Sequence, residues 1–384
     1  MTTTTHSRRS LQFHLPGTAA ALLAFAAWTQ CSFAAPVVQA VNGTLNDGAT
    51  VTITGSGFGT KPSAAPLVWD DATGTSITAK WSGAWPDQSP GYNLTYYAPI
   101  RGVSPPHSHA TRYIAGAHAG SSGANAGWNV ILYKNITAPA MPYYIYASWY
   151  QRFDPNWHFG GDNNTKTFDW SYGTGPYNNP YSWYICYGPP HPDSAADTGA
   201  QWTYENGTPL LNPDLNGHIA WWGLAADPFT QWSKVEIAIK VTNQQNGYVQ
   251  MWENGRQVMN YAGITDNYPG TQRSIGIGGY ARMYGYSSNW RYFDDAYIDT
   301  TLSRVVLADT PVLSQARIVE NQIPSAWSTG SITAKVNLGK FTQGQAAYLF
   351  VVDSTGAVTA TGLKVTAGGT AAAIPDAPSS FQVD

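Results

Sequence analysis

Charged side chains are scarce in this chain of 384 residues. Asp, Glu, Lys and Arg together make up 11% of the sequence, whereas ordinary globular proteins carry about 25%. The formal net charge is −3, and Lys and Arg do not gather in a basic stripe. Because a domain that binds nucleic acid shows such a stripe, we expect no nucleic-acid partner.

Long apolar runs are also missing. The longest, at residues 19–28, follows Arg8 and Arg9 and precedes a small-x-small triplet at 32–34. This order is typical of a secretory signal peptide, and the run is shorter than the roughly 20 residues that span a bilayer. We therefore predict a signal peptide over residues 1–35, a secreted protein (extracellular or periplasmic) and no membrane span.

Cysteine is nearly absent from the rest of the chain. Removing residues 1–35 deletes Cys31, two arginines and no acidic residue, so Cys186 remains alone and the formal charge moves from −3 to −5. A single cysteine forms no internal disulfide and matches no zinc or iron–sulfur spacing. A secreted chain of this kind needs a large apolar core, which about 350 residues can supply.

Strong helix formers are few, while the sequence holds 38 Gly and 25 Pro. No 3.6-residue apolar period is sustained, but alternating β-branched and aromatic runs recur between turn residues. The clearest predicted strands span 128–133, 143–153, 165–172, 181–187, 232–241, 247–252, 274–277 and 291–298. In 232–241, Val235, Ile237 and Ile239 alternate with Lys234 and Glu236, which predicts one core face and one solvent face. Asn254-Gly255 predicts a tight hairpin turn.

The two ends of the chain resemble the two halves of an IPT/TIG-type immunoglobulin-like domain. Residues 51–62 read VTITGSGFGTKP, and residues 326–341 read AWSTGSITAKVNLGKF, followed by AAYLFVVDSTGAV and TGLKV. Neither end is long enough to form a sandwich of about seven strands alone. The resemblance implies one small β-sandwich built from both ends, with another domain inserted between them.

The inserted region resembles the concanavalin A-like jelly roll of lectins, laminarinase-type glycosidases and several polysaccharide lyases. The resemblance rests on WSKVEIAIKV, GYVQMWENGRQV and a closing RYFDDAYID, with an opening LVWDD that would pair with that last strand. We expect an all-β protein, a two-sheet jelly-roll sandwich plus a smaller Ig-like sandwich. Two tandem sandwiches are the alternative, although no Ser/Pro-rich linker divides the region.

These patterns divide the chain into five segments. The predicted segments are a signal peptide (1–35), the first Ig-like half (36–66), the jelly roll (67–310), the second Ig-like half (311–367) and a flexible tail (368–384).

Aromatic residues are abundant where charge is not, with 16 Trp and 24 Tyr. Their flat apolar faces and polar tips match the C–H faces and hydroxyls of sugar chains, although many must also serve as core filler. We therefore expect an extracellular polysaccharide as partner of a monomeric protein. The predicted sugar-stacking residues are Trp149, Tyr150, Trp157, Trp170 and Trp183.

Glycoside hydrolysis needs two carboxylates, and the chain has four Glu, none in the E-x-D-x-E strand motif of laminarinase-type enzymes. Lyase chemistry instead needs a group that neutralises a uronate carboxylate and Tyr or His to move protons. Residues 105–120 hold a histidine cluster beside arginines, and 143–152 place tyrosines on one strand face. The predicted catalytic residues are His109, Tyr146, Arg112, Arg101 and His107.

The RTEL-like and QIH-like runs of alginate lyases are absent, so the resemblance assigns no active residue. Three functions remain open: β-elimination on a uronate-containing glycan, which we favour, non-catalytic glycan binding, and hydrolysis by an unrecognised carboxylate pair. No cofactor is required by any of them.

A calcium site is one interpretation of the acidic pairs in the first and last jelly-roll strands. Asp70, Asp71, Asp294 and Asp295 would meet where those strands pair, and carboxylate oxygens are ligands that Ca²⁺ prefers. The alternative is that these acids cap turns.

Overall fold

The computed structural model describes residues 34–85, 94–119, 130–154, 165–175, 182–188, 199–204, 222–223, 231–266, 270–280 and 288–370. The predicted signal peptide and most of the predicted tail lie outside these ranges. Among the described residues, no helix is long and apolar enough to cross a membrane. In the part of the chain that the structure describes, regular structure is almost entirely β, with short 3₁₀ helices at Ile77–Ala79 and Leu313–Gln315.

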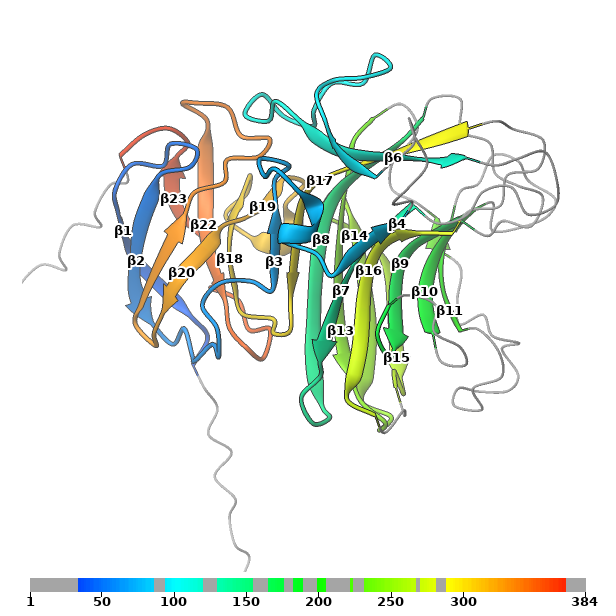
Figure 1. The fold of residues 1–384 in the computed structure, drawn as a ribbon. Helices are drawn as coiled ribbons and strands as arrows, with labels where there is room; N and C mark the ends of the chain where they lie inside the picture. The colour runs from blue at the N-terminus through cyan, green and yellow to red at the C-terminus, as the bar shows by residue number, and fades with distance from the viewer. Residues whose placement is uncertain are drawn as a thin grey trace, which may run out of the picture. The chain divides into compact units, whose positions relative to one another are not determined.

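The central part is a sandwich of two antiparallel sheets (Figure 1), which confirms the predicted all-β class. The seven-stranded sheet runs β12 (Trp222–Gly223), β11 (Gly199–Tyr204), β10 (Ser182–Gly188), β9 (Thr165–Tyr172), β16 (Gln272–Gly279), β7 (Val130–Thr137) and β4 (Gly83–Trp85). The eight-stranded sheet runs β15 (Arg256–Gly263), β14 (Gly247–Glu253), β13 (Ser233–Val241), β8 (Tyr143–Phe153), β17 (Ser288–Asp299), β6 (Tyr113–Ala119) and β5 (Thr95–Tyr97), with β3 (Val68–Asp70) beside β17. The β3–β17 pair joins the first and last strands as predicted.

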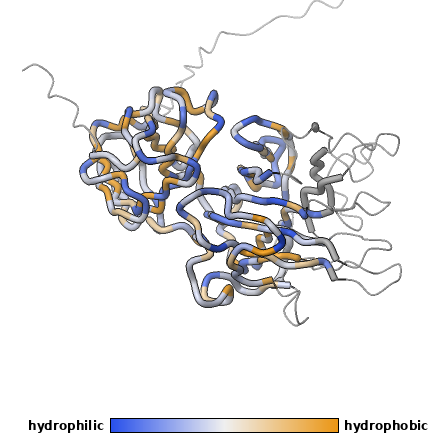
Figure 2. The backbone as a smooth tube through the Cα atoms, turned by 90° about the horizontal axis from the view of Figure 1, so that it is seen from above, coloured by the Kyte–Doolittle hydropathy of each residue, from blue (hydrophilic) through white to orange (hydrophobic). Residues whose placement is uncertain are grey.

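Period-two alternation places one face of each strand in the core. Ile237 and Ile239 of β13 pack with Ile145 of β8, Phe168 of β9 and Ile277 of β16 in one buried cluster. Hydrophilic and hydrophobic stretches are intermixed along the backbone (Figure 2). An apolar core between the sheets is the main source of stability for a domain of this size.

The predicted hairpin joins β14 to β15. Asn254 and Gly255 have φ of 47° and 69°, the pair of left-handed residues that a type I′ turn requires. A Cβ at Gly255 would lie 2.1 Å from the carbonyl oxygen of Ala316. Glycine is therefore required here both for its backbone conformation and for the close approach of a second chain segment.

An alanine in the left-handed conformation costs about 1–2 kcal/mol by itself. Gly255→Ala is expected to destabilise the protein by more than this, because its methyl group would also clash with the backbone of Ala316. Gly344→Ala is the matched control, since Gly344 has φ +86° and open space around its Cβ position. Urea unfolding of both variants checks this. Equal decreases in the free energy of unfolding of the two variants would show that the close approach of Ala316 does not contribute to the requirement for glycine.

A second, smaller sandwich is built from both ends of the chain. One sheet runs β1 (Val37–Asn42), β2 (Thr50–Ser56), β21 (Ser331–Lys335) and β20 (Ile323–Trp327); the other runs β19 (Val319–Asn321), β18 (Arg304–Ala308), β22 (Ala346–Val352) and β23 (Leu363–Thr366). Ile53 pairs with Ile332, and Figure 1 shows blue β2 among the orange strands. The predicted pairing of the two ends is confirmed. We call this unit the terminal sandwich.

One predicted boundary is wrong. Strand β18 falls inside the 67–310 range assigned to the jelly roll, yet it pairs with β22 and β19 of the terminal sandwich. Val305 and Leu307 of β18 point into the core of that sandwich. The chain therefore passes from one unit to the other before Arg304.

The predicted solvent face of β13 is also wrong. Lys234 and Glu236 are only 5% and 7% exposed, because strand β19 of the terminal sandwich covers this face. Glu320 of β19 accepts a hydrogen bond from Lys234 Nζ at 2.5 Å, and Asn321 donates to Ser148 Oγ of β8 at 2.6 Å. Alternation identified the two faces correctly but did not reveal what lay on the polar one.

Candidate functional site

A cleft of about 590 Å³ opens where the eight-stranded sheet meets the terminal sandwich. The sheet contributes side chains from the outer face of β13, β14 and β15, and the terminal sandwich contributes Arg304, Val319 and the turns near Leu313 and Thr355. From the sheet the lining residues are Glu236, Ala238, Tyr248, Gln250, Trp252 and Gln257. Neither unit forms this cleft alone.

Strand β14 lines the cleft because it alternates strictly. Val249 and Met251 are fully buried in the core, whereas Tyr248, Gln250 and Trp252 are partly exposed on the other face. Gln250 lies opposite Ala238 of β13 in register, and the small alanine leaves room over the floor. Two aromatic rings and an amide of one strand face therefore line the cleft.

Beside the cleft, four side chains from four strands interact. The buried Tyr146 hydroxyl donates to Glu236 Oε1 at 2.6 Å and accepts from Asn321 Nδ2 at 3.3 Å. The Arg304 guanidinium lies 4.1 Å from the centre of the Tyr146 ring. Its Nη1 donates to the Leu302 carbonyl at 2.9 Å, and its Nε has no hydrogen-bond partner among the described residues. A carboxylate and a guanidinium therefore line one cleft.

The two tyrosines near Arg304 are both held in the neutral form at physiological pH. Burial raises the pKa of Tyr146, and the neighbouring Glu236 charge raises it further. Burial and Tyr144 raise the pKa of Tyr248 to about 12, although Arg304 opposes the shift. Both phenols can donate hydrogen bonds or protons, but neither is a phenolate base.

A second network is sealed between the sheet and the terminal sandwich. Glu320 accepts hydrogen bonds from the Tyr150 hydroxyl, from Lys234 Nζ and from the backbone N–H of Lys340. The Glu320 and Lys234 side chains are 0% and 6% exposed. Burial, together with Glu320, raises the pKa of Tyr150 well above its usual value. This network fastens the two units together and is closed to a polymer.

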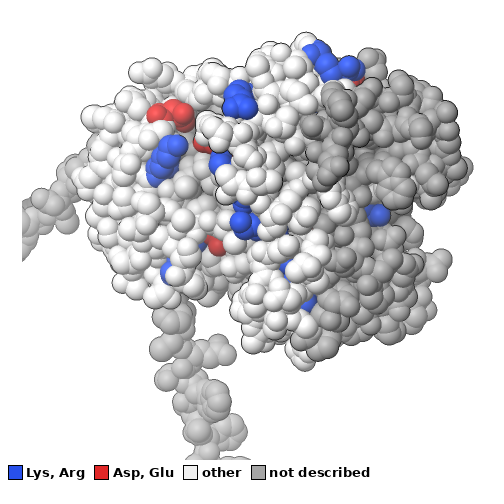
Figure 3. Space-filling model, viewed as in Figure 1, with Lys and Arg blue, Asp and Glu red and all other residues white. Residues whose placement is uncertain are grey.

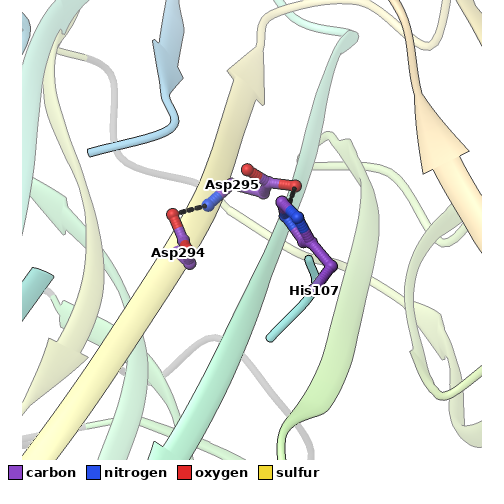
Figure 4. A group of neighbouring side chains, drawn as sticks. All are labelled: His107, Asp294 and Asp295. Atoms are coloured by element: carbon purple, nitrogen blue, oxygen red, sulfur yellow. Dashed lines mark hydrogen bonds and ion pairs between the residues drawn. The ribbon is translucent and has the colours of Figure 1, made fainter. Parts of the chain in front are cut away.

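A third group, His107 with Asp294 and Asp295, lies at the bulge in β17 (Figure 4). His107 Nε2 is 3.0 Å from Asp295 Oδ2. Burial opposes charging of His107, but the hydrogen bond and charge of Asp295 raise its pKa above the ordinary value. An adjoining cavity of about 80 Å³ is lined by His107, His109, Arg112 and Asp295 among others. This volume holds a few water molecules and excludes a sugar ring.

The predicted catalytic residues do not form one sugar-binding site. His109 Nε2 lies 3.1 Å from the Phe341 carbonyl oxygen, and Arg112 donates to the carbonyl oxygens of Gly74 and Tyr96. Arg101 forms an ion pair of 2.8 Å with Asp154. His107, His109 and Arg112 meet at the 80 Å³ cavity, and Tyr146 lies under the large cleft, where it contacts Glu236.

Stacking on sugars is contradicted for three predicted residues. Trp149 is 0% exposed and Trp170 1% exposed, both inside the core between the sheets. Tyr150 is 1% exposed beneath the terminal sandwich. Alternation explains the first case, since Trp149 shares its face with Ile145 and Ala147 rather than with Tyr146. Trp157 and the side chain of Trp183 lie outside the described residues.

The four predicted calcium ligands fall into two groups. Asp70 accepts hydrogen bonds from Lys80, Trp81 and Tyr96, and Asp71 accepts from Thr73 and Lys80. These partners fix the turn after β3. Asp294 and Asp295 instead lie beside His107, a residue that was not among the predicted metal ligands.

The stability of the protein should depend on pH through the buried carboxyl group of Asp299, at the end of β17. Asp299 Oδ2 lies 2.7 Å from Lys61 Nζ, and burial raises the pKa of Asp299 from 3.8 to about 6 despite that lysine. The folded carboxyl thus binds its proton more tightly than the unfolded one. The stability it contributes is full below pH 3.8 and is lost as the pH rises through 6.

Wild-type protein should therefore lose about 2–3 kcal/mol relative to Asp299→Asn between pH 4 and 7, at about 1.36 kcal/mol for each unit of pKa shift. Urea midpoints of both proteins across this range measure the difference. A difference that is constant with pH would contradict the assignment.

Sequence reasoning missed most of the cleft. Tyr248, Gln250 and Trp252 alternate visibly in the sequence, so their shared face was a detectable signal. Glu236 was noticed but was placed in solvent, and Arg304 carried no signal because its position depends on the docking of β18. Charged groups are rare on the viewed face of the molecule (Figure 3). An arginine and a glutamate that line the same cleft are therefore unusual for this protein.

No family model matches the chain, and no curated protein matches it. Among solved structures, the chain is similar to an endo-β-1,4-glucuronan lyase from the fungus Trichoderma reesei, with 11% identity, a TM-score of 0.43, and coverage of 62% of this chain and 96% of that one. It is also similar to the alginate lyase Aly36B, with 14% identity, a TM-score of 0.40, and coverage of 62% and 98%. A third is a carbohydrate esterase from the Shiga toxin-encoding bacteriophage phi24B, with 10% identity, a TM-score of 0.35, and coverage of 61% and 97%.

Proposed function

We propose that the cleft binds a uronate-containing polysaccharide and cleaves it by β-elimination. The observation that carries the proposal is that Arg304, whose one side-chain hydrogen bond among the described residues goes to the Leu302 carbonyl, lines the same cleft of about 590 Å³ as Glu236. Guanidinium recognises carboxylate through paired N–H donors. A uronate carboxylate held by Arg304 would be neutralised, which acidifies the C5 proton next to it.

Glu236 is the proposed proton acceptor. Its Oε1 already accepts from Tyr146, so the second carboxylate oxygen is the one to take the C5 proton. The C5–H bond breaks, the C4–C5 double bond forms and the C4–O4 bond breaks, and the proton passes from Glu236 to the leaving O4 oxygen. Tyr146 acts as a positioning residue, since it is fully buried and holds the carboxylate without reaching a sugar.

Trp252 and Tyr248, which both line the cleft, are the proposed stacking residues. They are four residues apart on one strand face, roughly 13 Å at the usual strand rise. Two flat rings at that separation would stack on sugar units that are not adjacent but lie farther apart along the same extended chain. The same spacing favours a second candidate, non-catalytic glycan binding, because stacking needs no acid or base.

Hydrolysis finds less support. Among the described residues that line the cleft, no second carboxylate faces Glu236, whereas both glycosidase mechanisms need an acid and a nucleophile or base. The proposed location is extracellular or periplasmic, following removal of residues 1–35.

The test is to incubate the full mature protein with glucuronate-, mannuronate- and galacturonate-containing polysaccharides and follow the ultraviolet absorbance of the unsaturated product. We expect absorbance to rise with one of them, and to be lost in Glu236→Gln. Tyr348→Phe is the control for folding, since Tyr348 lies on β22 outside the cleft. Binding without a double bond would establish the second candidate, and a new reducing end without a double bond would overturn the lyase in favour of a hydrolase.

A further inference from the structure

The bulge in β17 directs two adjacent carboxylates toward one histidine. Neighbouring residues of a regular strand point to opposite faces. Here Asp294 pairs with Tyr150 and Tyr297 with Ser148, so β17 has one residue more than β8, and Asp295 has φ +47°. One ligand atom each from His107, Asp294 and Asp295 lies within 4.8 Å of the others.

This group is deeply buried and incompletely satisfied. Asp294 and Asp295 are 0% and 2% exposed. Asp294 Oδ1 accepts from the backbone N–H of Asp295 at 2.9 Å, but Asp294 Oδ2 has no partner among the described residues, and neither has His107 Nδ1. A buried carboxylate oxygen without a partner is costly. A cation between these side chains would remove that cost.

We propose that His107, Asp294 and Asp295 bind a divalent transition metal ion of the Zn²⁺ class. Imidazole nitrogen with two carboxylates is a donor set that suits Zn²⁺, whereas Ca²⁺ and Mg²⁺ take oxygen ligands. The adjoining 80 Å³ cavity leaves room for a water as fourth ligand. Asn337 Nδ2, 3.3 Å from Asp295 Oδ2, would orient that carboxylate from outside the ligand shell.

The site would act as a clamp between three segments. His107 belongs to the segment between β5 and β6, the two aspartates belong to β17, and Asn337 follows β21 of the terminal sandwich. Because the ion would bind the folded arrangement and not the unfolded chain, it should stabilise the protein by mass action. This inference is independent of the proposed lyase activity.

The experiment uses the full mature chain after treatment with a chelator and dialysis. Calorimetric titration with Zn²⁺ should give one equivalent, and Co²⁺ in its place should give visible d–d absorbance. Asp294→Asn and His107→Gln should each weaken Zn²⁺ binding by at least about 100-fold. Loss of a residue that only orients a ligand already costs up to about 100-fold, and loss of a ligand itself should cost no less. His109→Gln is the matched control, because His109 bonds to the Phe341 carbonyl and is outside the group; it should bind as the wild type does.

Circular dichroism of each variant establishes that it is folded, and Asn is nearly isosteric with Asp. Zn²⁺ should also raise the melting temperature of the wild type and of His109→Gln, but not that of Asp294→Asn. Absence of stoichiometric binding would overturn the proposal. So would equal affinity in His107→Gln and His109→Gln, or tighter binding of Ca²⁺ than of Zn²⁺.

Discussion

Glu320→Ala is expected to destabilise the protein by about 3–5 kcal/mol, the usual loss when one partner of a buried ion pair is removed. Lys234 would remain 5% exposed with no carboxylate beside it, and Tyr150 and the Lys340 backbone N–H would lose their acceptor. Because these groups join the eight-stranded sheet to the terminal sandwich, the unfolding transition should also become less cooperative. Urea unfolding followed by tryptophan fluorescence measures both effects.

The control separates the lost charge from the lost packing. A Glu320→Leu, Lys234→Met double variant removes both charges together. It should therefore be considerably more stable than Glu320→Ala, in which the buried Lys234 charge has no partner. A loss below about 1 kcal/mol in Glu320→Ala would contradict the interpretation of this network as the fastening between the two units.

Arg304→Gln is expected to weaken binding of the uronate polysaccharide by about 100-fold, close to 3 kcal/mol, which is within the range for loss of one partner of a desolvated charge pair. The physical reason is that Arg304 lines the cleft and that its one side-chain hydrogen bond among the described residues goes to the Leu302 carbonyl, which leaves donors of the guanidinium for the ligand. Affinity for a neutral polysaccharide should change little. Isothermal titration with both polymers measures the two affinities.

Arg317→Gln is the matched control for Arg304. Arg317 also belongs to the terminal sandwich and donates to the Gly255 carbonyl, but it does not line the cleft. It should leave both affinities unchanged. An equal loss for neutral and acidic polymers in Arg304→Gln would show that the arginine shapes the cleft instead of recognising a carboxylate.

Local patterns predicted the strands well. The bounds of β8 and β9 agree with the predicted 143–153 and 165–172, since alternating aromatic and β-branched residues between turn residues identify a strand by themselves. The Asn254-Gly255 pair predicted the hairpin turn, and the resemblance of both chain ends to halves of one domain predicted their pairing. The alternation of residues 143–153 also predicts that Trp149 faces the core. The expectation that Trp149 stacks on sugars disagreed with this pattern.

The composition and the period-two alternation of this chain determined an all-β protein, because each strand must bury one face whatever its neighbours are. Only the tertiary structure decided what became of the polar faces. Docking of β18 and β19 turned Lys234 and Glu236 from presumed surface groups into buried partners, and it brought Arg304 into a cleft with residues 47 to 68 positions earlier in the chain. Such contacts between distant segments depend on how two complete sandwiches fit together, and no local sequence pattern specifies that.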